Sequence, residues 1–204
     1  MDSKWVEWTK KLQAIAQNGL TFAQDKYDLE RYRQLREITA EIIASYSDHN
    51  FPEVMNYLSK ETGYMTPKVD VRGVVFSEDK LLFVKEILDG RWTLPGGWAD
   101  VCASPKENVE REVFEESGFE VQATRLLAVY DRSRHGHVPE FPHHVYKMFF
   151  LCEVTGGSPQ LSMETNGVEF FGLDGLPELS VSRITEKQIR RMYELRDLRI
   201  VDVD

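Results

Sequence analysis

Hydrophobic residues recur at helical spacing over roughly the first 65 positions of the chain. Residues 3–17 carry one apolar stripe, which predicts an amphipathic helix that ends at Asn18 and Gly19. A longer helix is predicted over residues 27–45, and a third, shorter helix is expected to begin after Pro52.

After Pro67 the period of the hydrophobic pattern changes to two, as in half-buried strands. A polar turn separates residues 69–75 from residues 81–86, so these segments are predicted to pair as a hairpin. The remaining elements are one helix in the middle, a closing helix capped by Thr185, and strands at residues 121–130, 144–154 and 167–173. This order predicts an α+β sandwich over residues 67–204, preceded by a small all-helical N-terminal domain over residues 1–66.

The composition is that of an ordinary globular protein, with 204 residues, 42% of them hydrophobic, and a formal net charge of −9 at pH 7. The negative charge argues against tight non-specific binding to duplex DNA or to an anionic membrane. No apolar run reaches the length of a membrane span, and the first residues lack the hydrophobic core of a signal peptide. Cys102 and Cys152 are the only cysteines, which indicates a reducing compartment. We therefore expect a cytoplasmic protein with no membrane partner.

The predicted helical domain is too small to bury all of the aromatic residues that it carries. These are Trp5, Trp8, Phe22, Tyr27, Tyr32 and Tyr46. One interpretation is that they form a homodimer interface through the N-terminal helices. The alternative is that the helices cap the domain that follows them in the same chain.

Residues 96–119 are expected to form a tight glycine loop followed by a short acidic helix. Ser104 suits the N-cap of this helix, Pro105 suits its first position, and Glu107 can accept a hydrogen bond from the cap amide in return. Gly118 suits the left-handed residue that ends a helix.

Three glutamates of this helix, at positions i, i+3 and i+4, share one face. They are Glu112, Glu115 and Glu116. Like charges at this spacing repel one another, and a bound divalent cation would remove the repulsion. Carboxylate oxygens suit Mg²⁺ or Mn²⁺. On spacing alone, a solvated acidic face remains the alternative.

The spacing of glycines, arginine and glutamates resembles the box of the Nudix hydrolases, G-x5-E-x7-R-E-U-x-E-E-x-G-U, where U is aliphatic or aromatic. The matching residues are Gly97, Arg111, Glu112, Val113, Glu115, Glu116, Gly118 and Phe119. Ala103 stands where the pattern has its first glutamate, which usually supports the box arginine. This departure leaves Arg111 without its usual support, and Glu107 is expected to substitute.

The resemblance implies the α/β/α Nudix fold and hydrolysis of a phosphoric anhydride with Mg²⁺ or Mn²⁺ as cofactor. It implies that the Gly96 carbonyl, Glu112 and Glu116 are metal ligands, with Glu115 joining directly or through water. Arg111 is expected to orient a glutamate, and a surface salt bridge is its alternative role.

Nudix enzymes usually recruit one more glutamate from a later loop, as a further ligand or as general base. Glu164, in the segment SMETNG between two predicted strands, is the leading candidate for this role. Glu169 is second, because its place just before two phenylalanines favours a strand.

A second unusual segment, residues 131–144, lies between two predicted strands and concentrates basic side chains in an acidic protein. Long ordered loops are often functional, and arginine can grip phosphate through two N–H groups. The candidate substrate-binding residues are Arg132, Arg134, His135 and His137 in this loop, and Trp98, whose ring could stack on a base. A zinc site built from the histidines and a solvated loop are the alternatives.

Further segments resemble a two-domain bacterial Nudix subgroup that includes pyrophosphatases acting on CDP-choline and ADP-ribose. They are the N-terminal helical segment, GGWADV running into SPKE, DRSRHGH, and the final SRITEKQI. The resemblance implies a nucleotide-conjugate substrate, cleaved as CDP-choline to CMP and phosphocholine or as ADP-ribose to AMP and ribose 5-phosphate. The alternatives are RNA hydrolysis or RNA-end trimming at the same metal site, and a non-catalytic nucleotide-ligand sensor.

Overall fold

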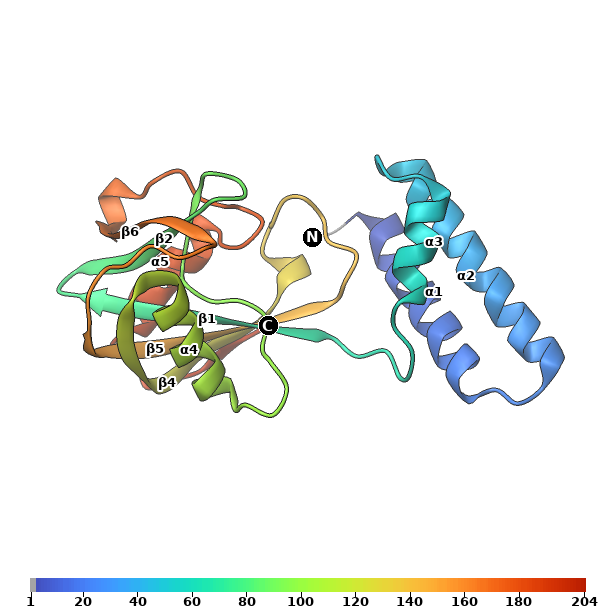
Figure 1. Ribbon diagram of the computed structural model, residues 1–204, viewed down its shortest axis with the longest axis horizontal. Coiled ribbons are helices and arrows are strands. Elements are labelled where there is room, and N and C mark those ends of the chain that lie inside the picture. Colours follow the sequence, from blue (N-terminus) through green and yellow to red (C-terminus); the bar gives the residue numbers. More distant parts are fainter. Residues whose placement is uncertain (1–2) are drawn as a thin grey trace. The chain divides into compact units, whose positions relative to one another are not determined.

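The computed structural model describes residues 3–204, which divide into two compact units (Figure 1). One unit holds the chain up to Pro67 together with Glu140–His144, and the other holds Lys68–Pro139 and Val145–Asp204. Within residues 3–204, no helix combines the length and hydrophobicity that crossing a membrane requires.

The helical unit contains three helices, α1 (Lys4–Phe22), α2 (Lys26–Tyr46) and α3 (Phe51–Ser59). Each of the two later helices begins with a side-chain cap. The Asp25 carboxylate accepts from the first amides of α2, and Asn50 forms a reciprocal capping box with Glu53 at the start of α3.

The prediction that Asn18 and Gly19 end the first helix was wrong, because α1 continues to Phe22. Gly19 serves a close approach between helices: a Cβ there would lie 2.4 Å from ring carbons of Tyr32 on α2. Asn18 also lies within α1, and its side-chain oxygen accepts a hydrogen bond from Met65 N.

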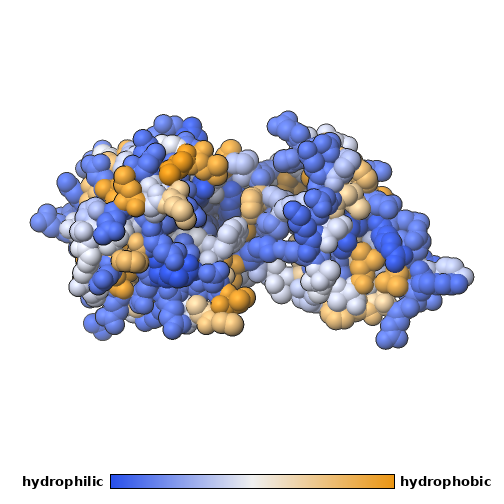
Figure 2. All heavy atoms as spheres, viewed as in Figure 1, coloured by the Kyte–Doolittle hydropathy of each residue, from blue (hydrophilic) through white to orange (hydrophobic). Residues whose placement is uncertain are grey.

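The helical unit has a small apolar core, formed by Ala40, Val54 and Leu58. Much of its aromatic surface is exposed, and Trp8 on α1 retains 58% of its accessible area. Figure 2 shows hydrophobic residues interspersed with hydrophilic ones on the face that it displays. The second unit, in contrast, has two larger cores on opposite faces of a sheet.

The second unit is built on a mixed seven-stranded sheet. Its strands are β1 (Lys68–Ser77), β2 (Lys80–Glu86), β3 (Trp92–Thr93), β4 (Phe119–Asp131), β5 (Val145–Gly157), β6 (Thr165–Gly172) and β7 (Asp202–Val203). The order is β3-β2-β1-β5-β4-β7, with β6 paired to β2. β1 and β5 are parallel, and the predicted β1–β2 hairpin is antiparallel.

Helices cover both faces of this sheet (Figure 1). Helix α4 (Pro105–Ser117) packs through Val109 and Val113 against odd-numbered residues of β1. Helix α5 (Glu186–Leu195) packs through Ile189 and Met192 against the opposite face. The Nudix-type α/β/α sandwich and the α+β class are therefore confirmed.

β1 and β2 pair directly only near their turn, at Phe76 and Ser77 of β1. Along the rest of β1 the glycine-rich segment 95–99 takes the place of β2. Val71 N donates to Gly97 O, and Gly73 N donates to Pro95 O, both at 2.8 Å. This pairing holds the glycine loop against the middle of the sheet.

Candidate active site

The box helix α4 begins and ends as its sequence predicts. The Ser104 hydroxyl accepts from Glu107 N, and the Glu107 carboxylate accepts from Ser104 N at 2.7 Å. Gly118 adopts φ +77°, and its N–H donates to Phe114 O at 2.8 Å. Both ends of the helix are thus set by local hydrogen bonds.

Two glycines bring the loop close to the sheet and to the helix. A Cβ on Gly96, which has φ +140°, would lie 2.1 Å from Val71 O. A Cβ on Gly97 would lie 2.7 Å from a Glu112 carboxylate oxygen. Gly96 N also donates to a Glu116 carboxylate oxygen at 2.8 Å. Glycine at these positions therefore allows the box carboxylates to approach the loop backbone.

The box carboxylates are partly removed from water. Glu116 retains 5% of its accessible area, and burial, with smaller contributions from Glu86 and Glu112, raises its pKa to about 8. Burial also raises the pKa of Glu112, and the charges of Glu115 and Glu164 add to this effect. Such crowded carboxylates fit a divalent cation, which would compensate their charge.

In the structure the box carboxylates are paired with groups of the protein. Glu112 and Glu115 lie 3.1 and 3.0 Å from the Arg111 guanidinium, and Glu116 faces the Gly96 amide. Across residues 3–204 no group of three or more histidine, cysteine or acidic side chains is arranged as a metal-ligand set. The donors have the right chemistry for Mg²⁺ or Mn²⁺, and the assignment of each ligand stays a prediction.

Arg111 is held by residues other than the one expected. Its guanidinium lies 3.0 Å from Asp100 and donates to the Asn108 side-chain oxygen at 3.1 Å. The prediction that Glu107 replaces the missing glutamate at Ala103 was wrong, because the Glu107 carboxylate bends back to Ser104 N.

Glu164 lies in the turn that precedes β6, and this turn is fastened to α4. Thr165 Oγ1 donates to Glu116 O at 2.7 Å, and Glu164 N donates to Ser162 Oγ. The Glu164 charge acts on both Glu112 and Glu86. The structure therefore brings Glu164 near the box, whereas Glu169 is exposed within β6, as its sequence context indicates.

Sequence reasoning missed the charged residues of β1 and β5. Asp70 accepts from Arg72 Nη2 at 2.7 Å and from Lys147 Nζ at 2.5 Å, and all three residues are buried. Burial lowers the pKa of Lys147 to about 7. Two charged residues at i and i+2 in an otherwise apolar strand were a signal for this cluster.

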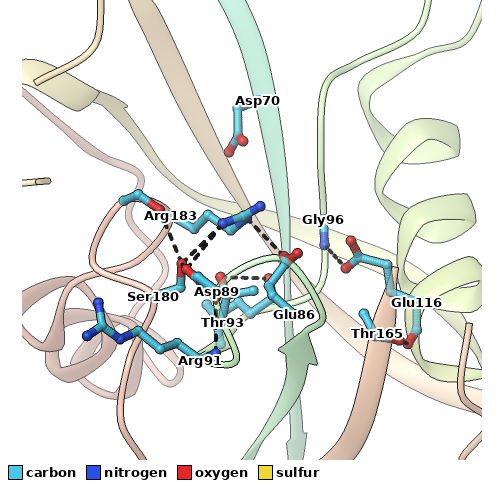
Figure 3. A network of polar contacts seen from close by, with 12 residues as sticks. Asp70, Glu86, Asp89, Arg91, Thr93, Gly96, Glu116, Thr165, Ser180 and Arg183 are labelled. Carbon is cyan, nitrogen blue, oxygen red and sulfur yellow. Dashed lines mark hydrogen bonds and ion pairs between the residues drawn. The ribbon is translucent and has the colours of Figure 1, made fainter. Parts of the chain in front are cut away.

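Glu86 was missed as well. It lies at the end of β2, where the register with β6 shifts, and it is nearly buried. Arg183 Nε lies 2.9 Å from its carboxylate. Figure 3 shows Glu86 in the network that also contains Gly96 and Glu116.

Comparison with known proteins identifies the family to which this site belongs. Residues 66–192 match the NUDIX domain, and residues 3–58 match a UDP-X-like, N-terminal oligomerisation domain. The chain belongs to the Nudix family. It is a Nudix pyrophosphatase, and enzymes of this family generally use divalent metal ions.

Two relatives of this Nudix hydrolase match nearly its whole chain, and a third matches about two thirds of it. A Bacillus subtilis protein, provisionally named as an ADP-ribose pyrophosphatase, is 43% identical over 95% of this chain and 93% of its own length. The crystal structure of a UDP-X diphosphatase is 34% identical, covers 98% of each chain, and superimposes with a TM-score of 0.65. An ADP-ribose pyrophosphatase from Streptococcus suis is 41% identical over 68% of this chain and 100% of its own, with a TM-score of 0.62.

The basic side chains of this loop in the Nudix hydrolase each have their own hydrogen-bond partners. The Arg132 guanidinium donates to Pro139 O and Ser182 O, and His137 Nδ1 bonds Val181 O at 2.9 Å. Burial, together with the charge of Lys147, lowers the pKa of His137 to about 3, so its imidazole is neutral at pH 7.

The other two candidates of the loop, His135 and Arg134, contact different residues. His135 stacks on Tyr130, bonds Asp204 at 2.8 Å, and lines a cavity of about 670 Å³ beside α5 and the C-terminal residues. Arg134 is exposed, 3.8 Å from Asp131. Trp98 is half exposed in the glycine loop. The substrate-binding role of all five predicted residues stays a prediction.

Proposed function

We propose that this Nudix hydrolase cleaves the pyrophosphate of a nucleoside diphosphate linked to X, with ADP-ribose as the leading substrate and CDP-choline as the next. The observation that carries the proposal is the position of the buried Glu116 and the partly buried Glu112 against the glycine loop. The names of the relatives support the substrate class: two are named for ADP-ribose and one for UDP-X. No relative among these supports the RNA alternative.

Within this proposal, the Gly96 carbonyl, Glu112 and Glu116 hold Mg²⁺ or Mn²⁺, with Glu115 joining directly or through water. The ion would supply charge neutralisation at the phosphate and a lowered pKa for bound water. Arg111 orients Glu112 and Glu115, to which it is already paired. Glu164 would take the proton from the attacking water. Its charge acts on Glu112, which supports this role.

The substrate class is tested with a panel of ADP-ribose, CDP-choline and a UDP-sugar, each with Mg²⁺ or Mn²⁺. We expect metal-dependent release of the nucleoside monophosphate, strongest from ADP-ribose, and its loss in Glu112→Gln. Release of CMP from CDP-choline alone would keep the chemistry and change the substrate. If no conjugate is cleaved but a short RNA releases mononucleotides, the proposed substrate class is wrong.

We also propose that the N-terminal helices form a homodimer. The buried residues of α1, such as Val6, Gln13 and Ala16, lie on one face, while three large apolar residues at seven-residue spacing are exposed. These are Trp8, Ile15 and Phe22. The match of residues 3–58 to an oligomerisation domain supports this role.

The dimer is tested by sedimentation at micromolar concentration. We expect a dimer for the unaltered chain and a monomer, or a strongly weakened dimer, for Trp8→Glu, because a charge on an apolar interface must be desolvated. Lys187→Glu, which places a glutamate at an exposed position of α5, should leave the dimer intact. A monomeric unaltered chain would reject the proposal.

A further inference from the structure

The turn before α5 places an arginine, Arg183, beside Glu86 at the end of β2. Arg183 N and Ile184 N both donate to Ser180 O, at 2.8 and 2.9 Å. Ser180 is fully buried and its amide donates to Trp92 O, while Ile184 is fully buried in the apolar core under α5. The backbone that carries Arg183 is therefore fixed at both ends.

Three partners hold the Arg183 guanidinium. Its Nε lies 2.9 Å from Glu86, and its Nη1 lies 3.5 Å from Asp89 and donates to Ser180 Oγ at 3.3 Å. The contacts of the guanidinium thus run through Nε and Nη1 to two acids and one hydroxyl. The side chain retains 25% of its accessible area, so a ligand can reach it.

Glu86 connects this guanidinium to the box. Its charge raises the pKa of Glu116, after the larger effect of burial, and the charge of Glu164 acts on Glu86 itself. Figure 3 shows Arg183 directed toward Glu86, with Gly96 and Glu116 beyond Glu86 in that view. Arg183 is thus linked to the box carboxylates through Glu86.

The two other arginines of the site are engaged by partners of their own. Arg72 directs Nε and Nη2 to Asp70 and Nη1 to Leu94 O, and it is buried. Arg111 is already paired with Asp100, Glu112 and Glu115. A diphosphate substrate leaves oxygens beyond those that face the box carboxylates, and the planar guanidinium suits such oxygens.

We propose that Arg183 binds the substrate diphosphate through the exposed part of its guanidinium, and that Glu86 and Asp89 are positioning residues that hold this side chain. This proposal rests on the proposed function, because it assumes a diphosphate at the box. It gives a role to residues 180–184, in which the Ser180 hydroxyl and the buried Ile184 help to hold the Arg183 side chain in place.

The test is steady-state kinetics of Arg183→Gln and Arg183→Lys with ADP-ribose and Mg²⁺, or with whichever conjugate the panel selects. A lost hydrogen bond to a charged group predicts a rise in KM of about tenfold to a hundredfold for Arg183→Gln, with kcat within about threefold of the unaltered enzyme. Arg183→Lys should recover part of the loss, because it keeps the charge but not the planar geometry. The control Arg190→Gln, an exposed arginine of α5 paired with Glu186, should leave KM unchanged.

A purely structural role of Arg183 would give a different result. If Arg183→Gln and Arg183→Lys lower the melting temperature and leave KM unchanged, the proposal is overturned. Binding of inorganic pyrophosphate with Mg²⁺, measured by calorimetry, separates this result from a failure of the proposed function. If no conjugate is cleaved, weaker pyrophosphate binding by Arg183→Gln but not by Arg190→Gln still supports the proposal, and equal affinity in all three proteins overturns it.

Discussion

Glu116→Gln is expected to lower turnover about a thousandfold and, in the absence of metal and above about pH 8, to raise the melting temperature. Turnover falls because an amide is a neutral and weaker ligand than a carboxylate. Stability rises because the buried charge of Glu116 is costly, with Glu86 and Glu112 close by. The Gln side chain keeps an oxygen that can still accept from Gly96 N.

The pH dependence of this effect has a defined sign. The folded-state pKa of Glu116 is about 8, above its ordinary value of 4.5, so the folded protein binds this proton more tightly than the unfolded chain. The stability that the protonated group provides is fully present below pH 4.5 and is lost as the pH rises to about 8. The metal-free protein should therefore lose stability over this range, and Glu116→Gln should lose less.

Thermal melts between about pH 5 and pH 9, with and without Mg²⁺, measure both effects. Added Mg²⁺ should stabilise the unaltered protein above pH 8 more than it stabilises Glu116→Gln. Glu120→Gln, an exposed carboxylate on the strand after α4, is the matched control and should follow the unaltered protein. A variant that retains activity, or that melts lower than the unaltered protein above pH 8, would contradict the assignment of Glu116.

Glu164→Gln is expected to lower kcat at least about a hundredfold while leaving the fold intact, because the attacking water loses its proton acceptor. Glu164 is exposed, so its removal creates no cavity, and the turn is held by Ser162 and Thr165 rather than by its carboxylate. Single-turnover and steady-state rates, with the melting temperature as a check on folding, measure the effect.

Glu169→Gln is the control for this prediction, since Glu169 is an exposed glutamate of β6. Its activity should match that of the unaltered enzyme. Activity of Glu164→Gln within about threefold of the unaltered enzyme would reject the role of Glu164. A large loss in Glu169→Gln alone would move the role to that residue.

The elements of the catalytic unit follow from local rules, which is why the sequence predicts them well. The Ser104–Glu107 capping box and the left-handed Gly118 act over a few residues, so α4 begins and ends where its sequence indicates. The alternation in β1 likewise predicts which of its residues pack under α4 and which under α5.

Prediction from local sequence rules failed where the contacts of a residue in the folded chain decide its role. Gly19 was interpreted as a helix end, but it makes room for Tyr32 of the next helix. Glu107 was expected to support Arg111, but as the third residue of α4 its carboxylate caps Ser104, and Asp100 and Asn108 contact Arg111 instead.

The sequence by itself determined the family box, the carboxylate face of α4 and the order of elements, because each depends on spacing along one segment. Only the tertiary structure decided which charges meet. Lys147 joins Asp70 because β5 lies parallel to β1, and Arg183 meets Glu86 because the turn before α5 is anchored beside the end of β2. These contacts depend on strand order and on the path of the chain across the sheet, and hydrophobic period and residue spacing do not specify either of them.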